Sequence, residues 1–336
     1  MHSVNDVQSI YEYEEKHLSR FATLSSQTRG RQRPMEECDI RTPFSRDRDR
    51  ITHSKAFRRL MHKTQVFLTP EGDHYRTRLT HTFEVTQIAR VIARALYLNE
   101  DLVEAAALGH DLGHTPFGHA GERLLNSVYE GGFAHYEQSL RVVDLLENNG
   151  KGLNLTYEVR DAIRNHSGSN RALTPEGRIL KFADRIAYIN HDIDDAIRAG
   201  IMKSEDIPRD LRQILGDTHG VRINTLVRDT IFNSTDGEIR MSPEISDAMN
   251  RLREFMFEAV YKNPEAKGEE EKANVMLTYL YEYFYKHVDK LPAEYRQYLN
   301  FSPKGRVVCD YISSMTDRYA VRMFNELFIP KVWQRL

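Results

Sequence analysis

Apolar residues recur at helical spacing through most of this chain, and that periodicity most restricts the folds it can adopt. In residues 80–98, Ile88, Ile92 and Leu96 follow one another four residues apart, which places them on one face of an α-helix, with Thr80 as its expected cap. Strand patterns beyond residue 200 are weak and short. The sequence therefore predicts an all-α fold, with helices expected at 80–98, 101–110, 121–129, 135–148, 156–166, 176–199, 243–261, 270–288 and 305–327.

The length is that of one large domain with appendages. A chain of 336 residues can bury a substantial core, while its polar first stretch ends near Gly30 and Pro34 like an arm. We expect an N-terminal arm at 1–40, a catalytic core at 41–200, and a C-terminal helical region that packs on the core at 201–336.

Cysteine content and hydropathy bear on the compartment. Cys38 and Cys309 stand far apart and form no CxxC spacing, which argues against a disulfide framework or a thiolate zinc site. No apolar stretch approaches the ~20 residues that a membrane-spanning helix needs. We therefore expect a cytoplasmic protein that does not engage a membrane.

Charge is balanced overall but uneven along the chain. The formal net charge is -2, with 29% charged residues. This composition does not indicate a nucleic-acid partner, but it does not exclude one. Residues 41–63 are nevertheless cationic, because only Asp47 and Asp49 oppose their Lys and Arg side chains. This segment either meets phosphates or is a solvated helix face with its own ion pairs.

Histidines are concentrated in one part of the chain. Eight of the fourteen lie between His53 and His135. Four of them gather around one short loop and the segment that follows it: His110, His114, His119 and His135. A single histidine on an apolar face is more often a core residue than a ligand, but this grouping favours a metal site.

Two carboxylates accompany these histidines. Asp111 follows His110 where a helix gives way to a loop with Gly113 and Pro116, so both side chains can converge on one point. Asp184 interrupts the apolar face of a later helix, where a lone carboxylate is costly unless a cation or basic partner offsets it. Imidazole and carboxylate together suit Mn, Fe, Co, Ni or Zn better than Mg.

The order of these His and Asp residues, and the sequence around them, resembles a known family. The order His81, His110-Asp111, Asp184 is similar to the H…HD…D signature of the HD superfamily. The surrounding strings resemble bacterial deoxynucleoside triphosphate triphosphohydrolases; they are RTPFSRDRDRITHSKAFRRLMHKTQVF, RLTHTFEVTQIAR, GHDLGHTPFGHAGE, HYEQSL, KFADRIAYINHDIDD and DYISSMTDRYA.

The resemblance implies a fold, a reaction and a cofactor. The fold is an HD-domain helical bundle with an additional C-terminal helical region, in a homo-oligomer. The reaction splits a dNTP into a deoxynucleoside and inorganic triphosphate, by attack of water on the α-phosphate. The cofactor is a divalent metal ion (Mg, Mn, Co, Ni, Fe or Zn), and the implied ligands are His81, His110, Asp111 and Asp184.

Further residues receive catalytic roles from the same resemblance. His119 and Glu122 lie three apart at a helix start and share a face, which suits an acid/base couple, and the family uses these positions for proton transfer. The alternative for Glu122 is a first-turn helix acid favoured by the dipole. His114 and His135 match histidines that line the phosphate path.

Substrate contacts are also implied. Tyr188 and Asp192 follow Asp184 at i+4 and i+8, so the three share a helix face that is either a pocket wall or an ordinary polar stripe. The resemblance places Tyr188 near the phosphates and Asp192, with Gln65, near the sugar 3′-hydroxyl. It also implies that Arg78 and Arg185 face the triphosphate, and further pocket candidates are His166, Asp317 and Arg318.

Two other functions compete with this interpretation. One is another HD-type phosphohydrolase, such as a phosphodiesterase or nucleotidase. The other is a non-catalytic nucleotide-sensing scaffold in which the metal only joins helices. The products formed from a dNTP distinguish the three.

Overall fold

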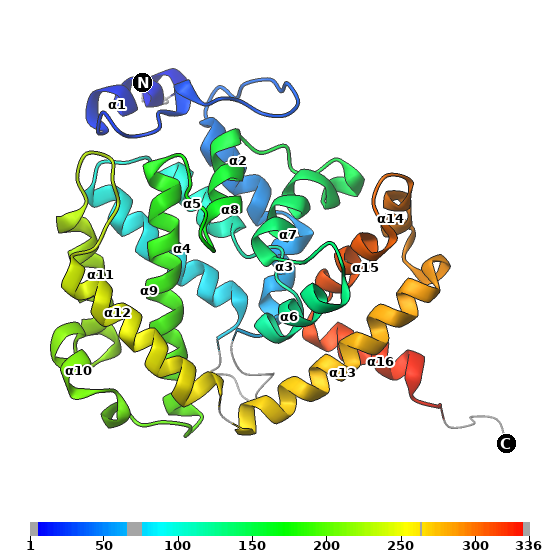
Figure 1. Ribbon diagram of the computed structural model, residues 1–336. Helices are drawn as coiled ribbons and strands as arrows, with labels where there is room; N and C mark the ends of the chain where they lie inside the picture. The colour runs from blue at the N-terminus through cyan, green and yellow to red at the C-terminus, as the bar shows by residue number, and fades with distance from the viewer. Residues whose placement is uncertain (1–5, 66–75, 263, 332–336) are drawn as a thin grey trace.

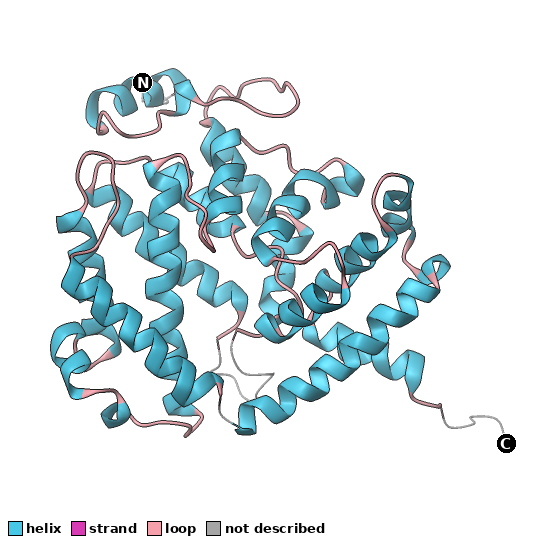
Figure 2. Cartoon of the chain, in the orientation of Figure 1, coloured by secondary structure: helices cyan, strands magenta, loops and turns pink. Residues whose placement is uncertain are grey.

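The computed structural model describes residues 6–65, 76–262 and 264–331, and α-helices dominate it (Figure 2). No described residue lies in a β-strand, and the three β-bridges among the described residues are isolated pairs. The all-α prediction is therefore confirmed. The helices of the described part are α1 (Val7–His17), α2 (Pro43–Thr52), α3 (Lys55–Arg59), α4 (Arg78–Ala95), α5 (Glu100–Gly109), α6 (Gly118–Val128), α7 (His135–Arg141), α8 (Tyr157–Asn165), α9 (Pro175–Arg198), α10 (Arg209–Leu215), α11 (His219–Asn233), α12 (Pro243–Met256), α13 (Pro264–Lys286), α14 (Ala293–Arg296), α15 (Lys304–Ser313) and α16 (Asp317–Phe328).

The start of α4 corrects one prediction. The sequence predicted Thr80 as the N-cap of α4, and this prediction is wrong. Thr77, three residues earlier, occupies the N-cap position. The Thr77 hydroxyl accepts the backbone N–H of Thr80, and the Thr80 hydroxyl accepts the N–H of Thr77. Thr80 is thus the third-position partner of a reciprocal capping box.

Two other helix predictions were incomplete. The expected helix 305–327 is two helices, because Thr316 caps a new one by accepting the Tyr319 N–H. Helices α1, α2, α3, α10, α11 and α14 were not predicted. The short helix α10, for example, buries only Leu211 and Leu215 and therefore carries a weak periodic signal.

Three clusters of buried apolar side chains hold the helices together. The first joins α4, α5 and α9 to α10, α11 and α12, and α4 and α9 run side by side through it (Figure 1). The second joins α6 to α13, α15 and α16, and the third joins α2, α3, α5 and α8. Representative members are Ile92, Ile186 and Leu252 in the first, Leu125, Leu277 and Val308 in the second, and Phe44, Leu60 and Ile163 in the third.

Residues 6–40 lie against the helical body and are attached by buried carboxylates. Glu176 is fully buried and accepts the Thr23 backbone N–H at 2.9 Å. Glu158 accepts the Arg29 backbone N–H at 2.8 Å. Because a buried carboxylate without partners is costly, these bonds stabilise the attachment. The expected division into arm, core and C-terminal region stays a prediction.

Part of the cationic segment is neutralised within the fold. Arg41 lies 3.0 Å from Asp49, and Arg48 lies 3.5 Å from Asp101 on α5. These pairs are partly exposed, so each contributes little stability. None of the helices in the described ranges combines the length and apolar character needed to cross a membrane.

Candidate active site

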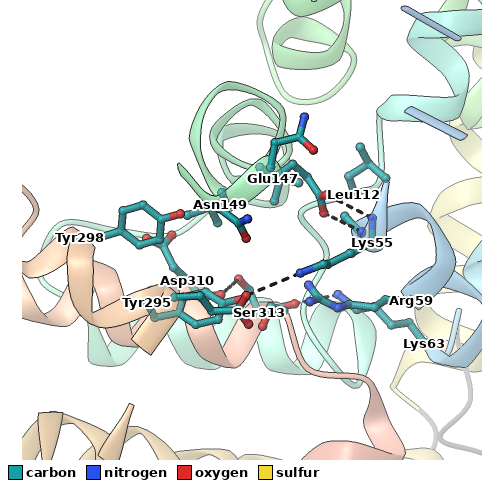
Figure 3. Close-up of a pocket in the computed structure, with 16 residues that line it drawn as sticks. Lys55, Arg59, Lys63, Leu112, Glu147, Asn149, Tyr295, Tyr298, Asp310 and Ser313 are labelled. Atoms are coloured by element: carbon teal, nitrogen blue, oxygen red, sulfur yellow. Dashed lines mark hydrogen bonds and ion pairs between the residues drawn. The ribbon is translucent and has the colours of Figure 1, made fainter. Parts of the chain in front are cut away.

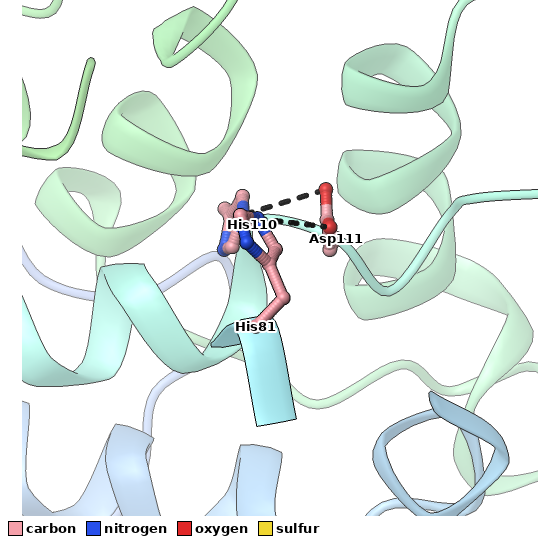
Figure 4. Close-up of side chains that lie close together, drawn as sticks. All are labelled: His81, His110 and Asp111. Atoms are coloured by element: carbon pink, nitrogen blue, oxygen red, sulfur yellow. Dashed lines mark ion pairs between the residues drawn. The ribbon is translucent and has the colours of Figure 1, made fainter. Parts of the chain in front are cut away.

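Three packed helices bring the four predicted metal ligands together. His81 lies in the first turn of α4, His110 follows the last residue of α5 with Asp111 next, and Asp184 lies within α9. Figure 4 shows the two imidazoles directed toward Asp111. The first apolar cluster fixes α4, α5 and α9 against one another, so the packing of the helices sets the position of each ligand.

The distances among these side chains are those of one coordination shell. His81 Nε2 lies 3.1 Å from Asp184 Oδ1 and 3.9 Å from Asp111 Oδ2. His110 Nε2 lies 3.4 Å from Asp111 Oδ1 and 3.8 Å from Asp184 Oδ1. Atoms bound to one ion at about 2.0–2.2 Å stand roughly 3–4 Å apart, so these separations fit a single cation, and the ligand atoms of His81, His110 and Asp111 all lie within 4.8 Å of one another.

His110 gives the clearest test of whether a cation fits. Its Nδ1 lies 2.6 Å from the Ala107 carbonyl, and because a carbonyl only accepts, Nδ1 carries the proton. In the neutral ring, Nε2 then presents a lone pair. That atom is buried and has no hydrogen-bond partner among the described residues, and it faces the carboxylates of Asp111 and Asp184. A divalent cation would relieve this repulsion and complete the ligand set.

Both carboxylates are held in the ionised form that a metal requires. Burial alone would raise the pKa of Asp111, but the adjacent rings of His110 and His114 and the Arg78 guanidinium hold it well below its usual range. Burial likewise opposes ionisation of Asp184, yet the hydrogen bond from His81 lowers the pKa of that carboxyl. The pair is thus ready to bind a cation.

The loop after Asp111 lies close against α7, and only glycine fits at its tightest point. The Gly113 N–H donates to Ser139 Oγ at 2.9 Å, and that hydroxyl donates to the His110 carbonyl at 2.6 Å. A Cβ at Gly113 would lie 2.1 Å from the backbone nitrogen of Ser139. This contact positions the His110-Asp111 pair through the backbone.

Gly113→Ala is therefore expected to destabilise the protein by about 3 kcal/mol, because the added methyl meets backbone that cannot give way. Urea unfolding followed by circular dichroism measures this change. Gly220→Ala is the matched control, since nothing lies within 4 Å of its Cβ position, and it should be neutral or slightly stabilising. Equal stability of the two variants would contradict the close approach.

A second group of titratable side chains adjoins the ligands. Glu122 on α6 accepts from His135 Nδ1 at 2.8 Å and lies 3.4 Å from His119 Nδ1. Burial alone would raise the pKa of Glu122, but hydrogen bonds from His119 and His135 lower it far below the usual value. Glu122 is therefore a carboxylate, while the side chain of His119 is 66% exposed and faces solvent.

Two further histidines close this group on its buried side. The ring of His114 stacks on that of His135, with centroids 4.2 Å apart. His166, at the end of α8, lies with its Nε2 3.3 Å from His135 Nε2. Burial, followed by the charges of His110 and His135, lowers the pKa of His166 to about 3, so its imidazole is neutral.

The predicted substrate residues of α9 are arranged along the helix. Asp192 is 3% exposed, and Tyr188 is half-buried against the first cluster. Burial, with the charge of Asp184, raises the pKa of the Tyr188 phenol, so the hydroxyl keeps its proton. Arg185 donates to the side chain of Asn250 on α12. The roles of Tyr188, Asp192 and Arg185 stay predictions.

Arg78 and Gln65 offer polar atoms without partners beside the ligand cluster. Arg78 is 2% exposed, and its NH1 donates to Asp111 Oδ2 at 2.8 Å. Among the described residues, its Nε and NH2 are buried and unpartnered, as is Oε1 of Gln65. The Arg78 side chain and the Gln65 backbone carbonyl adjoin Gly118, whose φ of +55° suits glycine. Unsatisfied buried donors on a cation favour an anionic ligand here.

Asp317 and Arg318, the remaining pocket candidates, differ in their surroundings. Asp317 is buried and accepts the backbone N–H groups of Phe117 and Thr64, each at 3.0 Å. Asp317 therefore holds Thr64 and Phe117, which lie far apart in the sequence, near each other beside the site. Arg318 is exposed at the start of α16.

One supporting residue was missed by the sequence analysis. Lys63 is buried behind the histidine loop and donates from Nζ to the carbonyls of His114 and Ser313. Figure 3 shows it with Lys55 and Arg59 among the residues that line a polar pocket. Burial lowers the pKa of Lys63 to about 7. The sequence carries no signal for this role, since Lys63 looks like any member of the cationic segment.

Comparisons with known proteins match families and relatives over most of this chain. The HD domain family matches residues 78–189, and the phosphohydrolase-associated domain family matches residues 239–326. A deoxyguanosinetriphosphate triphosphohydrolase-like protein of Caldanaerobacter subterraneus is 60% identical over 96% of this chain and 95% of its own. Another of that name from Clostridium perfringens is 51% identical over 96% and 98%.

Solved structures share the fold at low sequence identity. A phosphohydrolase from Bacteroides thetaiotaomicron superposes with a TM-score of 0.52 at 18% identity, over 83% of this chain and 67% of that one. A hypothetical protein from Aquifex aeolicus gives a TM-score of 0.50 at 18% identity, over 85% and 68%. These likenesses concern the fold alone.

Proposed function

Because the chain belongs to the family of deoxyguanosinetriphosphate triphosphohydrolase-like proteins, we propose that it hydrolyses deoxynucleoside triphosphates to a deoxynucleoside and inorganic triphosphate. The coarser assignment, a metal-dependent HD-type phosphohydrolase, follows from the domain match and the His/Asp cluster. The proposed function is more specific, because it names the substrate, a deoxynucleoside triphosphate, and the bond that is broken, between the α-phosphorus and the 5′-oxygen.

The observation that carries the proposal is the guanidinium of Arg78. It is buried beside the ligand cluster, and two of its three nitrogens have no partner among the described residues. A buried cation with unsatisfied donors is costly in an empty site. The oxygens of a polyphosphate would satisfy these donors, which supports a triphosphate substrate.

In the proposed reaction, water attacks the α-phosphorus while the nucleoside 5′-oxygen leaves with a proton. A divalent cation held by His81, His110, Asp111 and Asp184 would supply Lewis-acid polarisation and a more acidic water at that phosphoryl group. Arg78 would balance the charge that accumulates on the departing triphosphate.

The proton for the leaving group would come from His119. Glu122 is ionised, because the pKa of its carboxyl is held far below the usual value, so it serves to orient His119 and His135 through its two oxygens. His119 lies at the open side of the site and can exchange protons with solvent. His114 and His135 line the path between this pair and the ligand cluster.

The products of hydrolysis test the function. The purified protein is incubated with each dNTP and Mg²⁺ or Mn²⁺, and products are separated by anion exchange. We expect a deoxynucleoside and intact triphosphate. Pyrophosphate or orthophosphate would instead identify another HD-type phosphohydrolase, and nucleotide binding without any product would identify a sensing scaffold.

Sugar selectivity gives a prediction of its own. We propose that Asp192 and Gln65 hold the 3′-hydroxyl, pressing the ring against the pocket so that a 2′-hydroxyl has no space. GTP should then be a poor substrate where dGTP is a good one. An unpaired buried polar group costs ~1 to 3 kcal/mol, so dideoxy-GTP should lose about tenfold to a hundredfold in kcat/KM.

The matched comparison for this prediction uses two carboxylates of α9. Asp192→Ala should reduce the discrimination between dGTP, GTP and dideoxy-GTP. Asp194→Ala should preserve it, since Asp194 is partly exposed and pairs with Arg76 and Arg198. Equal substrate ratios in the wild type and Asp192→Ala would refute the sugar contact. The expected homo-oligomer and cytoplasmic location stay predictions.

A further inference from the structure

Residues 63–65 lie between two parts of the candidate site. On one side, the Arg78 backbone N–H, at the start of α4, donates to the Lys63 carbonyl at 3.1 Å. On the other side, a Cβ built on Gly118, at the start of α6, would lie 3.1 Å from the Gln65 carbonyl. The segment therefore contacts both the helix that carries the first predicted metal ligand and the turn that leads to the proposed proton donor.

The Lys63 side chain joins this segment to the loop after α5. It is 2% exposed, and its Nζ donates to the carbonyls of His114 and Ser313, the latter at 2.7 Å. Burial of an ammonium group is costly. A methionine of similar length would fill the same space without that cost, so what lysine contributes here is its two hydrogen bonds.

Asp317, in the first turn of α16, makes matching contacts from the C-terminal part of the chain. Its carboxylate is buried and accepts the backbone N–H groups of Thr64 and Phe117, each at 3.0 Å, and the Thr64 hydroxyl. Phe117 has a φ of +60°, in the left-handed region that residues with a side chain rarely adopt. The bond to its N–H therefore helps to hold the turn through which the chain enters α6.

Both side chains contact backbone that carries proposed functional groups. The ring of His114 stacks on that of His135, with centroids 4.2 Å apart, and its Nε2 lies 3.2 Å from Asp111 Oδ1. The turn at Phe117 leads, two residues later, to His119 in the first turn of α6. A displacement of either backbone group would therefore move an imidazole relative to the metal ligands.

We propose that Lys63 and Asp317 are positioning residues for the reaction. They hold residues 63–65 against residues 114–119 and so fix the two imidazoles of that loop relative to the metal ligands. Ser313 and Asp317 flank the turn between α15 and α16, in the part of the chain that matches the phosphohydrolase-associated domain family. The inference rests on the proposed function and adds that the C-terminal helices complete the support of the active site.

Hydrogen–deuterium exchange tests the positioning without substrate. Each variant, Lys63→Met or Asp317→Ala, removes bonds to the loop, so residues 114–119 should exchange about tenfold faster or more in both, while α9 keeps its wild-type rate. Lys55→Met is the matched control, since Lys55 belongs to the same cationic segment but its side chain is 57% exposed and pairs with Glu294 at 3.8 Å. Wild-type exchange of the loop in both Lys63→Met and Asp317→Ala would overturn the proposal.

Turnover gives the second measurement. Lys63→Met should lower kcat for a dNTP by about tenfold to a hundredfold, because a misplaced imidazole slows the chemical step. KM should change by less than about threefold, since binding persists, and metal content should equal that of the wild type. Lys55→Met should keep the wild-type kcat. A lower unfolding temperature with an unchanged kcat in Lys63→Met would reduce Lys63 to a structural residue and contradict the proposal.

Restoration by a small amine separates positioning from stability. Lys63 lines the polar pocket of Figure 3, so Lys63→Ala leaves a space that opens into this pocket. Propylammonium has the length and the N–H groups of the missing part of the side chain, so the kcat of Lys63→Ala should rise with its concentration. Tetramethylammonium, a cation without N–H donors, should have no such effect. An equal response to the two cations would refute the role of the hydrogen bonds.

Failure of this inference and failure of the proposed function give different results. Absence of product from every dNTP in the wild type would refute the proposed function. Hydrogen exchange would still decide whether Lys63 and Asp317 hold the loop, with faster exchange supporting the inference and wild-type exchange contradicting it.

Discussion

Asp184→Ala and His110→Ala are each expected to lose the tightly bound cation and about 10³-fold or more in kcat/KM. Each change removes a ligand atom from a cluster whose separations fit one ion. A thousandfold loss corresponds to ~4 kcal/mol of transition-state stabilisation. Metal content by inductively coupled plasma mass spectrometry and rates with dGTP measure the two effects together.

Exposed residues of the same types serve as controls for these variants. His287→Ala and Asp289→Ala lie at the surface beyond α13 and should keep full metal content and rate. Thermal unfolding of every variant identifies general misfolding. Normal metal content with an unchanged rate in Asp184→Ala or His110→Ala would remove these residues from the ligand set.

His119→Ala and Glu122→Gln are expected to lower kcat by about 10² to 10⁴-fold while metal and nucleotide binding persist. The His119→Ala variant would lack the proposed proton donor. Glu122→Gln keeps an oxygen that accepts from His135 but removes the charge that orients His119. Single-turnover rates and nucleotide affinity, measured separately, give the two quantities.

The neighbouring residue provides the control for this pair. Arg123 is mostly exposed and pairs with Glu270 on α13, so Arg123→Ala should leave kcat unchanged. The proton-transfer role would be excluded by the opposite pattern in His119→Ala, in which nucleotide binding weakens while turnover at saturation is normal.

Much of the fold was accessible from the sequence because long amphipathic helices carry a strong period. Helix α9 falls within one residue of its expected range and α4 within three, since apolar side chains line one face of each. Short helices are different. Seven residues give α10 only two buried leucines, and a break such as the one before α16 depends on the Thr316 cap rather than on periodicity.

The candidate site likewise has residues that the sequence pattern predicts and residues whose roles depend on how the helices pack. Sequence spacing and resemblance identified His81 and Asp184, whose side chains the structure brings within 3.1 Å. The pairing of His135 with His166 depends on how α7 and α8 meet, and thirty-one residues separate the two in the chain. Lys63 was missed for a related reason, because its role is to support two backbone carbonyls that are distant in sequence.

The central claim, that water attacks the α-phosphorus and triphosphate departs whole, is tested most directly by hydrolysis in ¹⁸O-labelled water. A dNTP is converted to completion with Mn²⁺, and both products are examined by mass spectrometry. We expect one ¹⁸O atom in inorganic triphosphate and none in the deoxynucleoside, because the bond between the α-phosphorus and the 5′-oxygen is the one that breaks. Label in a deoxynucleoside monophosphate, with release of pyrophosphate, would contradict the account.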